Sequence, residues 1–286
     1  MDLSFMFGLA AAVCWGSADF VAKLATERLG YLRTATFMQY VGGLLMLALT
    51  FQDLATLWAL SLATYLVLGL GVVNALATVA LFKSFEVGQL SIVSPIASSY
   101  PALSTVLAVM ILNETVSQTR FVGIVLILSG IVMVSIQKQS KISSRGRTFA
   151  AGVGYALLSF GLMGLLYFAL KIAVTSLGGL LPVLVIRWES AVILTIALAL
   201  STTRINTQVR KSMLAVAFVG VVDSIANIAY NLGISIGTVA VVSTLSGLFS
   251  AVTVLLACVF LRERFAKHQS VGFLAILIGV SVIGYF

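Results

Sequence analysis

The sequence has few charged residues, cysteines, prolines and histidines. Only 9% of its 286 residues are charged, and it holds 2 Cys, 3 Pro and 1 His. Soluble domains carry roughly 25% charged residues, so an ordinary globular enzyme is excluded. The net charge is +8, but too few basic residues are present to build a nucleic-acid-binding face. We interpret Cys14 and Cys258, which lie in apolar runs, as small buried residues and not as a disulfide or metal framework.

Apolar residues make up 60% of the chain, and its mean hydropathy is +1.14. About 20 mainly apolar residues cross a bilayer as a helix. By that measure the sequence predicts an all-α integral membrane protein with ten transmembrane helices. The expected helices are 3–25, 32–51, 57–82, 88–112, 117–137, 148–172, 180–201, 211–234, 237–261 and 267–286. The breaks between them include Glu27-Arg28, and the longest is 138–147, so we expect no extramembrane domain.

The chain repeats itself. At an offset of 149 residues, polar and glycine positions coincide over a long stretch, and near the N-terminus the offset is 148. The matches include Glu114 with Glu263, Gly123 with Gly272, Gly130 with Gly279, Asn74 with Asp223, Gly16 with Gly164, and Leu29-Gly30 with Leu177-Gly178. We therefore expect a first five-helix repeat over 1–137, a connecting loop over 138–147, and a second repeat over 148–286.

An odd number of helices in each repeat has a topological consequence. The second repeat must enter the membrane from the side opposite to the first, which gives an inverted repeat. Many secondary transporters are built in this way, with the substrate site near the midplane between the two copies. The repeat is therefore the strongest functional signal in the sequence.

Basic residues are distributed unevenly between the two sets of loops. The odd-numbered loops hold 14 of the 17 Lys and Arg residues, whereas the even-numbered loops hold only Arg120 and Lys171. Arg187 lies within an expected helix. By the positive-inside rule the odd loops are cytoplasmic, and both termini are outside.

Several segments are similar to one family. Trp15-Gly16 followed by Phe20 and Lys23 resembles the opening of EamA-type carriers, and the stretch from Pro101 to Glu114, with Gly123 and Gly130 after it, resembles their fourth and fifth helices. The chain is thereby identified as a ten-helix EamA-type member of the drug/metabolite transporter superfamily. This resemblance implies alternating-access carriage of small metabolites through a central cavity. It also implies cytoplasmic termini, against the charge distribution, so the orientation stays open.

Two carboxylates stand out inside expected helices. An ionised group at the bilayer centre costs at least about 2.5 kcal/mol, so each needs a partner or a wet cavity. Asp19 either lines the cavity, where it would bind a cation or a proton, or pairs with Lys23. Asp223, with Asn227 and Tyr230 continuing its face, either contacts substrate or a proton or makes an interhelical hydrogen bond. Both are candidates for proton coupling.

The remaining candidates are weaker. Arg187 either holds a substrate carboxylate or forms a structural ion pair, and Glu189 points to another face. The other candidate substrate-binding residues are Trp15, Asn74, Thr78, Ser94, Ser98 and Tyr100. Small residues such as Ser94 and Ser98 also let helices approach closely. We expect Lys23 and Lys171 to extend to the membrane surface, although equivalent lysines could also bind anions. Glu114 and Glu263 are expected to cap the helices that directly follow them.

These observations favour a secondary-active transporter of small polar or amphipathic metabolites, of the amino acid or organic amine type. Proton coupling and uncoupled facilitated diffusion remain alternatives. A non-transporting receptor or scaffold and an intramembrane enzyme are less favoured, because neither needs an inverted repeat. No nucleophile–base pair, metal-ligand cluster or phosphate loop is present, so no catalysis, metal or cofactor is expected. We expect a multi-pass protein of the inner or plasma membrane, in contact with lipid, that binds a small molecule and functions as a monomer.

Overall fold

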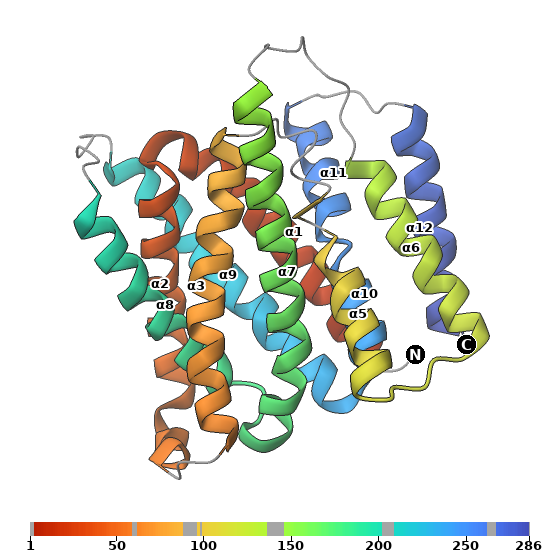
Figure 1. Cartoon of the computed structure of the whole chain (residues 1–286), viewed down its shortest axis with the longest axis horizontal. Coiled ribbons are helices and arrows are strands. Elements are labelled where there is room, and N and C mark those ends of the chain that lie inside the picture. Colours follow the sequence, from red (N-terminus) through yellow and green to blue (C-terminus); the bar gives the residue numbers. More distant parts are fainter. Residues whose placement is uncertain are drawn as a thin grey trace.

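The computed structural model describes residues 3–58, 62–87, 96–97, 99–135, 146–201, 209–261 and 267–285. Within these ranges the chain is helical and has no strand. The helices are α1 (Leu3–Leu29), α2 (Tyr31–Thr50), the 3-10 helix η1 (Phe51–Trp58), α3 (Leu62–Val87), α5 (Tyr100–Ile111), α6 (Gln118–Ser135), α7 (Gly146–Leu177), α8 (Leu181–Leu200), α9 (Val209–Ile236), α10 (Val239–Ser246), α11 (Phe249–Leu261) and α12 (Lys267–Tyr285). Figure 1 shows α1 beginning and α12 ending on the same, lower side.

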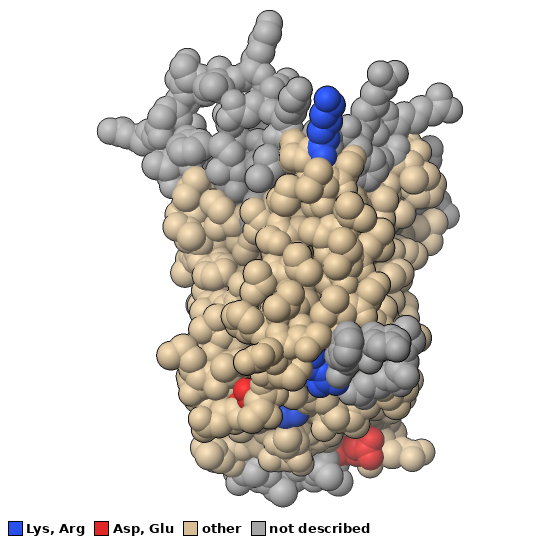
Figure 2. All heavy atoms as spheres, turned by 90° about the vertical axis from the view of Figure 1, so that its right-hand side faces the viewer, with Lys and Arg blue, Asp and Glu red and all other residues tan. Residues whose placement is uncertain are grey.

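Six of these helices are long and apolar enough to cross a membrane, namely α1, α2, α3, α7, α8 and α9. Shorter apolar stretches occur at Tyr100–Ile111, Gln118–Met133, Val239–Thr253 and Ser270–Ile283. On the face shown in Figure 2, the charged side chains lie near the top and in the lower part, and the broad band between them is uncharged. This is the surface of a multi-pass integral membrane protein, because an uncharged band is what the hydrocarbon core requires.

The helix order agrees with the expected segments, but several boundaries differ. Thus α3 begins at Leu62 rather than 57, and α7 ends at Leu177 rather than 172. The expected break at Glu27-Arg28 is wrong: α1 continues to Leu29 and ends at Gly30, whose φ is +81°. A left-handed backbone is open to glycine without strain, so Gly30 rather than the charged pair ends the helix.

The expected continuous helix 237–261 is also interrupted. It is divided into α10 and α11 at Gly247-Leu248. A Cβ on Gly247 would lie 2.7 Å from the Pro101 ring, so α5 crosses close to the backbone at this point. The expected helix 88–112 is described only from Ile96, and α5 supplies its second half.

The two halves of the chain show the same local structure at equivalent positions. Gly178, the repeat equivalent of Gly30, also has a positive φ of +74°. A Cβ on Gly16 would lie 2.5 Å from Val252, and one on Gly164 would lie 2.6 Å from Leu103, which is the equivalent contact. The repeat read from the sequence is therefore present in the packing.

α6 and α12 form an antiparallel pair, seen side by side in Figure 1. A Cβ on Gly123 would lie 3.1 Å from the Gly279 carbonyl oxygen, and one on Gly130 would lie 2.6 Å from that of Gly272. Gly123 thus meets the repeat equivalent of Gly130, and Gly130 meets the repeat equivalent of Gly123. Elsewhere α1 packs along α9 and α3 along α7, while α2 packs on both α8 and α9. Helices of both repeats thereby surround the centre of the molecule.

Candidate functional site

Asp19 is exposed on the interior side of α1. The side of α1 that faces away from the protein carries Met6, Val13 and Leu24, all exposed. At 100° per residue, Asp19 lies on the opposite side of the helix, with the buried Ala12, Trp15 and Ala22. It is exposed all the same, and it interacts electrostatically with Asp223 of α9. We infer that Asp19 faces a solvent-accessible space on the interior side of α1.

An ion pair lies beside this space. The Arg187 guanidinium of α8 donates to the Asp223 carboxylate of α9, and also to Gln39 Oε1 of α2 at 2.8 Å. Arg187 is 4% exposed and Asp223 17%. Asn227, one turn beyond Asp223, donates to the Asp223 carbonyl at 2.8 Å. Of the two interpretations of Arg187, the structure has the ion pair across helices.

The charges of this central group do not cancel. Arg187 compensates one carboxylate, that of Asp223, while Asp19 has no hydrogen bond or ion pair with another described residue. The side chain of Lys23, its alternative partner, lies outside the described residues. Among the described residues the central group thus holds two carboxylates and one guanidinium group, and Asp19 is the carboxylate without a cationic partner.

Aromatic side chains form a continuous layer next to Asp19. The ring centroid of Tyr167 lies 5.2 Å from that of Trp15, 5.0 Å from that of Tyr100 and 4.9 Å from that of Tyr230. All four side chains are buried. Asp19 interacts electrostatically with Tyr100 and Tyr167, so the layer and the carboxylate adjoin.

On the interior faces of α1 and α9, exposure is confined to a few central positions. On α9, Asp223 and Asn227 are partly exposed, whereas Tyr230 and Ile234 are 0% exposed. On α1, Asp19 is exposed and Trp15, one turn earlier, is 5% exposed. On the other side of these positions, Ala22 of α1 and Val216 and Val219 of α9 are buried as well. Buried side chains therefore flank the exposed positions at both ends, and the aromatic layer forms the flank on the Tyr230 side.

The other expected site residues divide into two groups. Asn74 donates to Ser190 Oγ at 2.9 Å and Thr78 is buried, so both lie on α3 in the packed region near α8. Ser94 and Ser98 lie outside the described residues. The structure therefore brings together Trp15, Asp19, Tyr100, Arg187, Asp223, Asn227 and Tyr230.

Two residues of the central group were missed from the sequence, Gln39 and Tyr167. Both could have been found from the repeat, because an offset of 148 places Gln39 on Arg187 and Asp19 on Tyr167. Gln39 lies within an expected helix and is 2% exposed. The sequence signal for Gln39 is that a polar residue within an expected helix occupies the position equivalent to the charged Arg187.

Glu114 and Lys171 both bind backbone groups near the start of α10, which for Glu114 differs from the expected cap. Glu114 accepts hydrogen bonds from the backbone N–H groups of Val239 and Ala240, at the start of α10 in the other repeat. It does not cap α6, because α6 begins only at Gln118 and Ser117 accepts from the Arg120 N–H. The Lys171 ammonium group donates to the carbonyls of Ile234 and Gly237, at the turn between α9 and α10.

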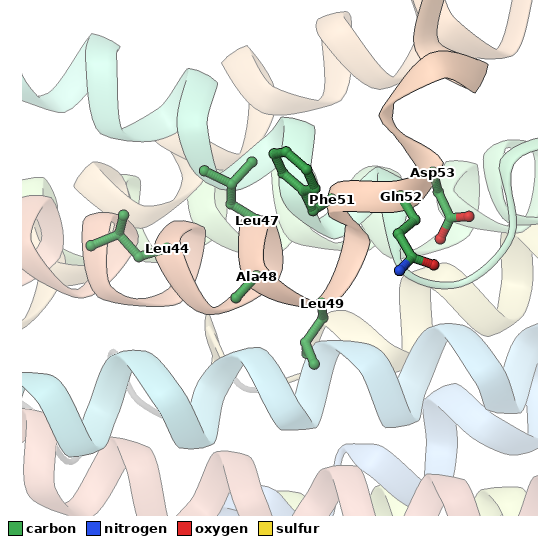
Figure 3. Close-up of a pocket in the computed structure, with 7 residues that line it drawn as sticks. All are labelled: Leu44, Leu47, Ala48, Leu49, Phe51, Gln52 and Asp53. Carbon is green, nitrogen blue, oxygen red and sulfur yellow. The ribbon is translucent and has the colours of Figure 1, made fainter.

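A separate pocket of about 670 Å³ lies at the end of α2 and the start of η1 (Figure 3). Its lining residues are Leu44, Leu47, Ala48, Leu49, Phe51, Gln52 and Asp53, all from one short stretch of chain. Phe51 is 72% exposed. The pocket has an outward-facing apolar lining and takes no residue from the central group, so we do not assign the functional site to it.

The helical architecture and the polar central group between two repeats define a class of protein, the polytopic membrane transporters of small molecules. The model of the EamA-like transporter family matches residues 3–136 and again residues 150–285. The chain belongs to the EamA-like transporter family, within the drug/metabolite transporter superfamily. The family resemblance found in the sequence is thus confirmed, and members of this family are transporters rather than enzymes.

Two further similarities bear on the architecture. An uncharacterized protein of Methanocaldococcus jannaschii is 30% identical over 138 residues, which are 48% of this chain and 98% of that protein. One half of this chain thus corresponds to a complete protein. A solved crystal structure matches with a TM-score of 0.81 at 16% identity, covering 98% of this chain and 95% of the other. At that identity the match shows the fold alone.

Proposed function

We propose that this protein is a secondary transporter, working by alternating access, of small polar or amphipathic metabolites that carry an ammonium group. Amino acids and organic amines are the corresponding substrate classes. Ten helices in two inverted five-helix repeats would supply two equivalent halves that can exchange conformations.

One observation carries the choice of substrate class. Asp19 presents a carboxylate, which has no cationic partner among the described residues, to the solvent-accessible space beside the aromatic layer of Trp15, Tyr100, Tyr167 and Tyr230. A carboxylate attracts an ammonium group, and aromatic rings add a cation–π attraction of about 0.5–2 kcal/mol. An anionic substrate without an ammonium group would be repelled by the Asp19 carboxylate.

The test is counterflow of radiolabelled amino acids and organic amines into proteoliposomes. We expect Asp19→Asn to lower exchange of ammonium-bearing substrates at least about tenfold, because the variant loses one charge-assisted hydrogen bond to the substrate. Ser17→Ala is the matched control, because Ser17 lies on the same helix and bonds only its own backbone, at the Val13 carbonyl. Unchanged exchange in Asp19→Asn would contradict the proposal.

Coupling to protons is part of the proposal, with Asp19 preferred to Asp223. Asp223 already has a cationic partner and an amide neighbour, so a proton there would break an ion pair. Asp19 has no such partner among the described residues. Since a protonated carboxyl no longer attracts an ammonium group, proton and substrate would compete for Asp19. Wild-type protein that exchanges substrate, yet accumulates none when a pH gradient is applied, would establish the uncoupled alternative.

A further inference from the structure

The turn between α9 and α10 is held by two oppositely charged side chains. The Glu114 carboxylate oxygens accept from the N–H groups of Val239 and Ala240, at 2.8 and 3.0 Å. The Lys171 ammonium group donates to the carbonyls of Ile234 and Gly237, the latter at 2.7 Å. A carboxylate thus meets the N-terminus of α10 and an ammonium group meets the C-terminus of α9, the favourable arrangement at both ends.

The two contacts join different parts of the molecule. Glu114 belongs to the first repeat, and lies in the connection from α5 to α6, whereas α10 belongs to the second. This connection has a defined shape: Asn113 takes a φ of +53°, and the N–H groups of Leu112 and Glu114 both donate to the Ala108 carbonyl. Glu114 is therefore presented to α10 by an ordered connection.

Directly next to this turn, α5 and α10 are joined by buried hydroxyl groups. Ser104 and Ser243 lie 2.5 Å apart, Oγ to Oγ, and Thr105 and Thr244 lie 3.3 Å apart. Ser243 also bonds Tyr230, which links the hydroxyl pairs to the aromatic layer. The layer, the hydroxyl pairs and the held turn thus follow one another away from the central group.

We propose that Glu114 and Lys171 hold this side of the transporter closed, and that both must release the α9–α10 turn before substrate can pass there. The inference rests on the proposed transport function. These are positioning residues: they contact helix ends and not the central group, and they fix α10 against α5. Without Glu114, the polar contacts that remain between α5 and α10 among the described residues are made by neutral hydroxyl groups.

Thiol labelling tests this directly and needs no substrate. In a background with Cys14→Ala and Cys258→Ala, Ser243→Cys reports on the closed side, where Ser243 is 0% exposed. Ser190→Cys, equally buried at the contact of α8 with α3, reports on general loosening. We expect Glu114→Ala and Lys171→Met each to raise the labelling rate at position 243 by about tenfold, because each variant loses a charged helix cap. The labelling rate at position 190 should not change.

The control variant is Ser117→Ala, which removes the N-cap of α6 from the same connection. It should change neither labelling rate. Unchanged labelling at position 243 in both charge variants would overturn the proposal, and so would an equal rise at positions 243 and 190. If labelling responds as expected while no substrate exchanges, the closing role stands and the proposed transport function fails.

Discussion

At the scale of single residues, the two repeats differ where the chemistry lies. Asp19 and Tyr167 are equivalent positions, and so are Gln39 and Arg187, and Asn74 and Asp223. The carboxylate facing the solvent-accessible space thus comes from the first repeat, while the ion pair comes from the second. Equivalent backbone positions supply different side chains, so the symmetry of the fold does not make the central group symmetric.

Glu189 breaks the same symmetry without an evident gain in stability. It occupies the position of Val41, and a Cβ on Gly71 would lie 2.2 Å from one of its carboxylate oxygens. That oxygen is buried and has no hydrogen-bond partner among the described residues. In the equivalent contact, Val41 packs against Gly220. A carboxylate therefore stands where the other repeat has an apolar contact between helices.

We predict that Glu189→Val stabilises the protein. The change removes a carboxylate from the membrane interior and restores the contact of the other repeat, which should raise the free energy of unfolding by about 1–3 kcal/mol. Thermal unfolding in detergent measures it. The reverse change at the equivalent position, Val41→Glu, should destabilise by a similar amount. A lower melting temperature for Glu189→Val would show that the carboxylate has a partner in the folded state.

At the scale of helices, close approach depends on a few glycines. We predict that Gly130→Ala destabilises the α6–α12 pair by about 1–3 kcal/mol, because its Cβ would lie 2.6 Å from the Gly272 carbonyl oxygen. A backbone oxygen cannot turn aside as a flexible side chain can. The helices would therefore have to move apart.

Gly154→Ala in α7 is the matched control, because a Cβ there meets nothing within 4 Å. It should be neutral or stabilise by up to about 1 kcal/mol, the helix propensity of alanine over glycine. Melting temperatures of the two variants, measured side by side, separate packing from propensity. Equal effects at both positions would refute the close approach of α6 and α12.

Helix order and the two-repeat pattern were predictable, because hydropathy and an offset of 149 residues are properties of the sequence itself. The interruption at Gly247 was not, since it depends on how closely Pro101 of α5 approaches. The same limit applies to Glu114 and Arg187. A charged residue shows in the sequence, but its partner is 125 residues away for Glu114 and Val239. Arg187 and Asp223 were each singled out, and only the packing of α8 on α9 shows that they pair.

At the scale of the whole molecule, the two repeats share an extensive interface made of whole helices packed lengthwise. α1 packs along α9, α3 along α7 and α6 along α12, so each pair takes one helix from each repeat. The aromatic layer likewise combines Trp15 and Tyr100 with Tyr167 and Tyr230. Neither repeat alone can bury these surfaces, and the central group exists only where the two meet.

We predict that the connection 138–147 is dispensable for assembly. Residues 1–137 and 148–286, expressed together as separate chains, should co-purify and restore exchange in proteoliposomes, because the interface rather than the connection holds the repeats together. Either half expressed by itself should give no exchange, since Asp19 and the Arg187–Asp223 pair would be separated. If the co-expressed halves fail to associate, the connection itself is required to bring the repeats together.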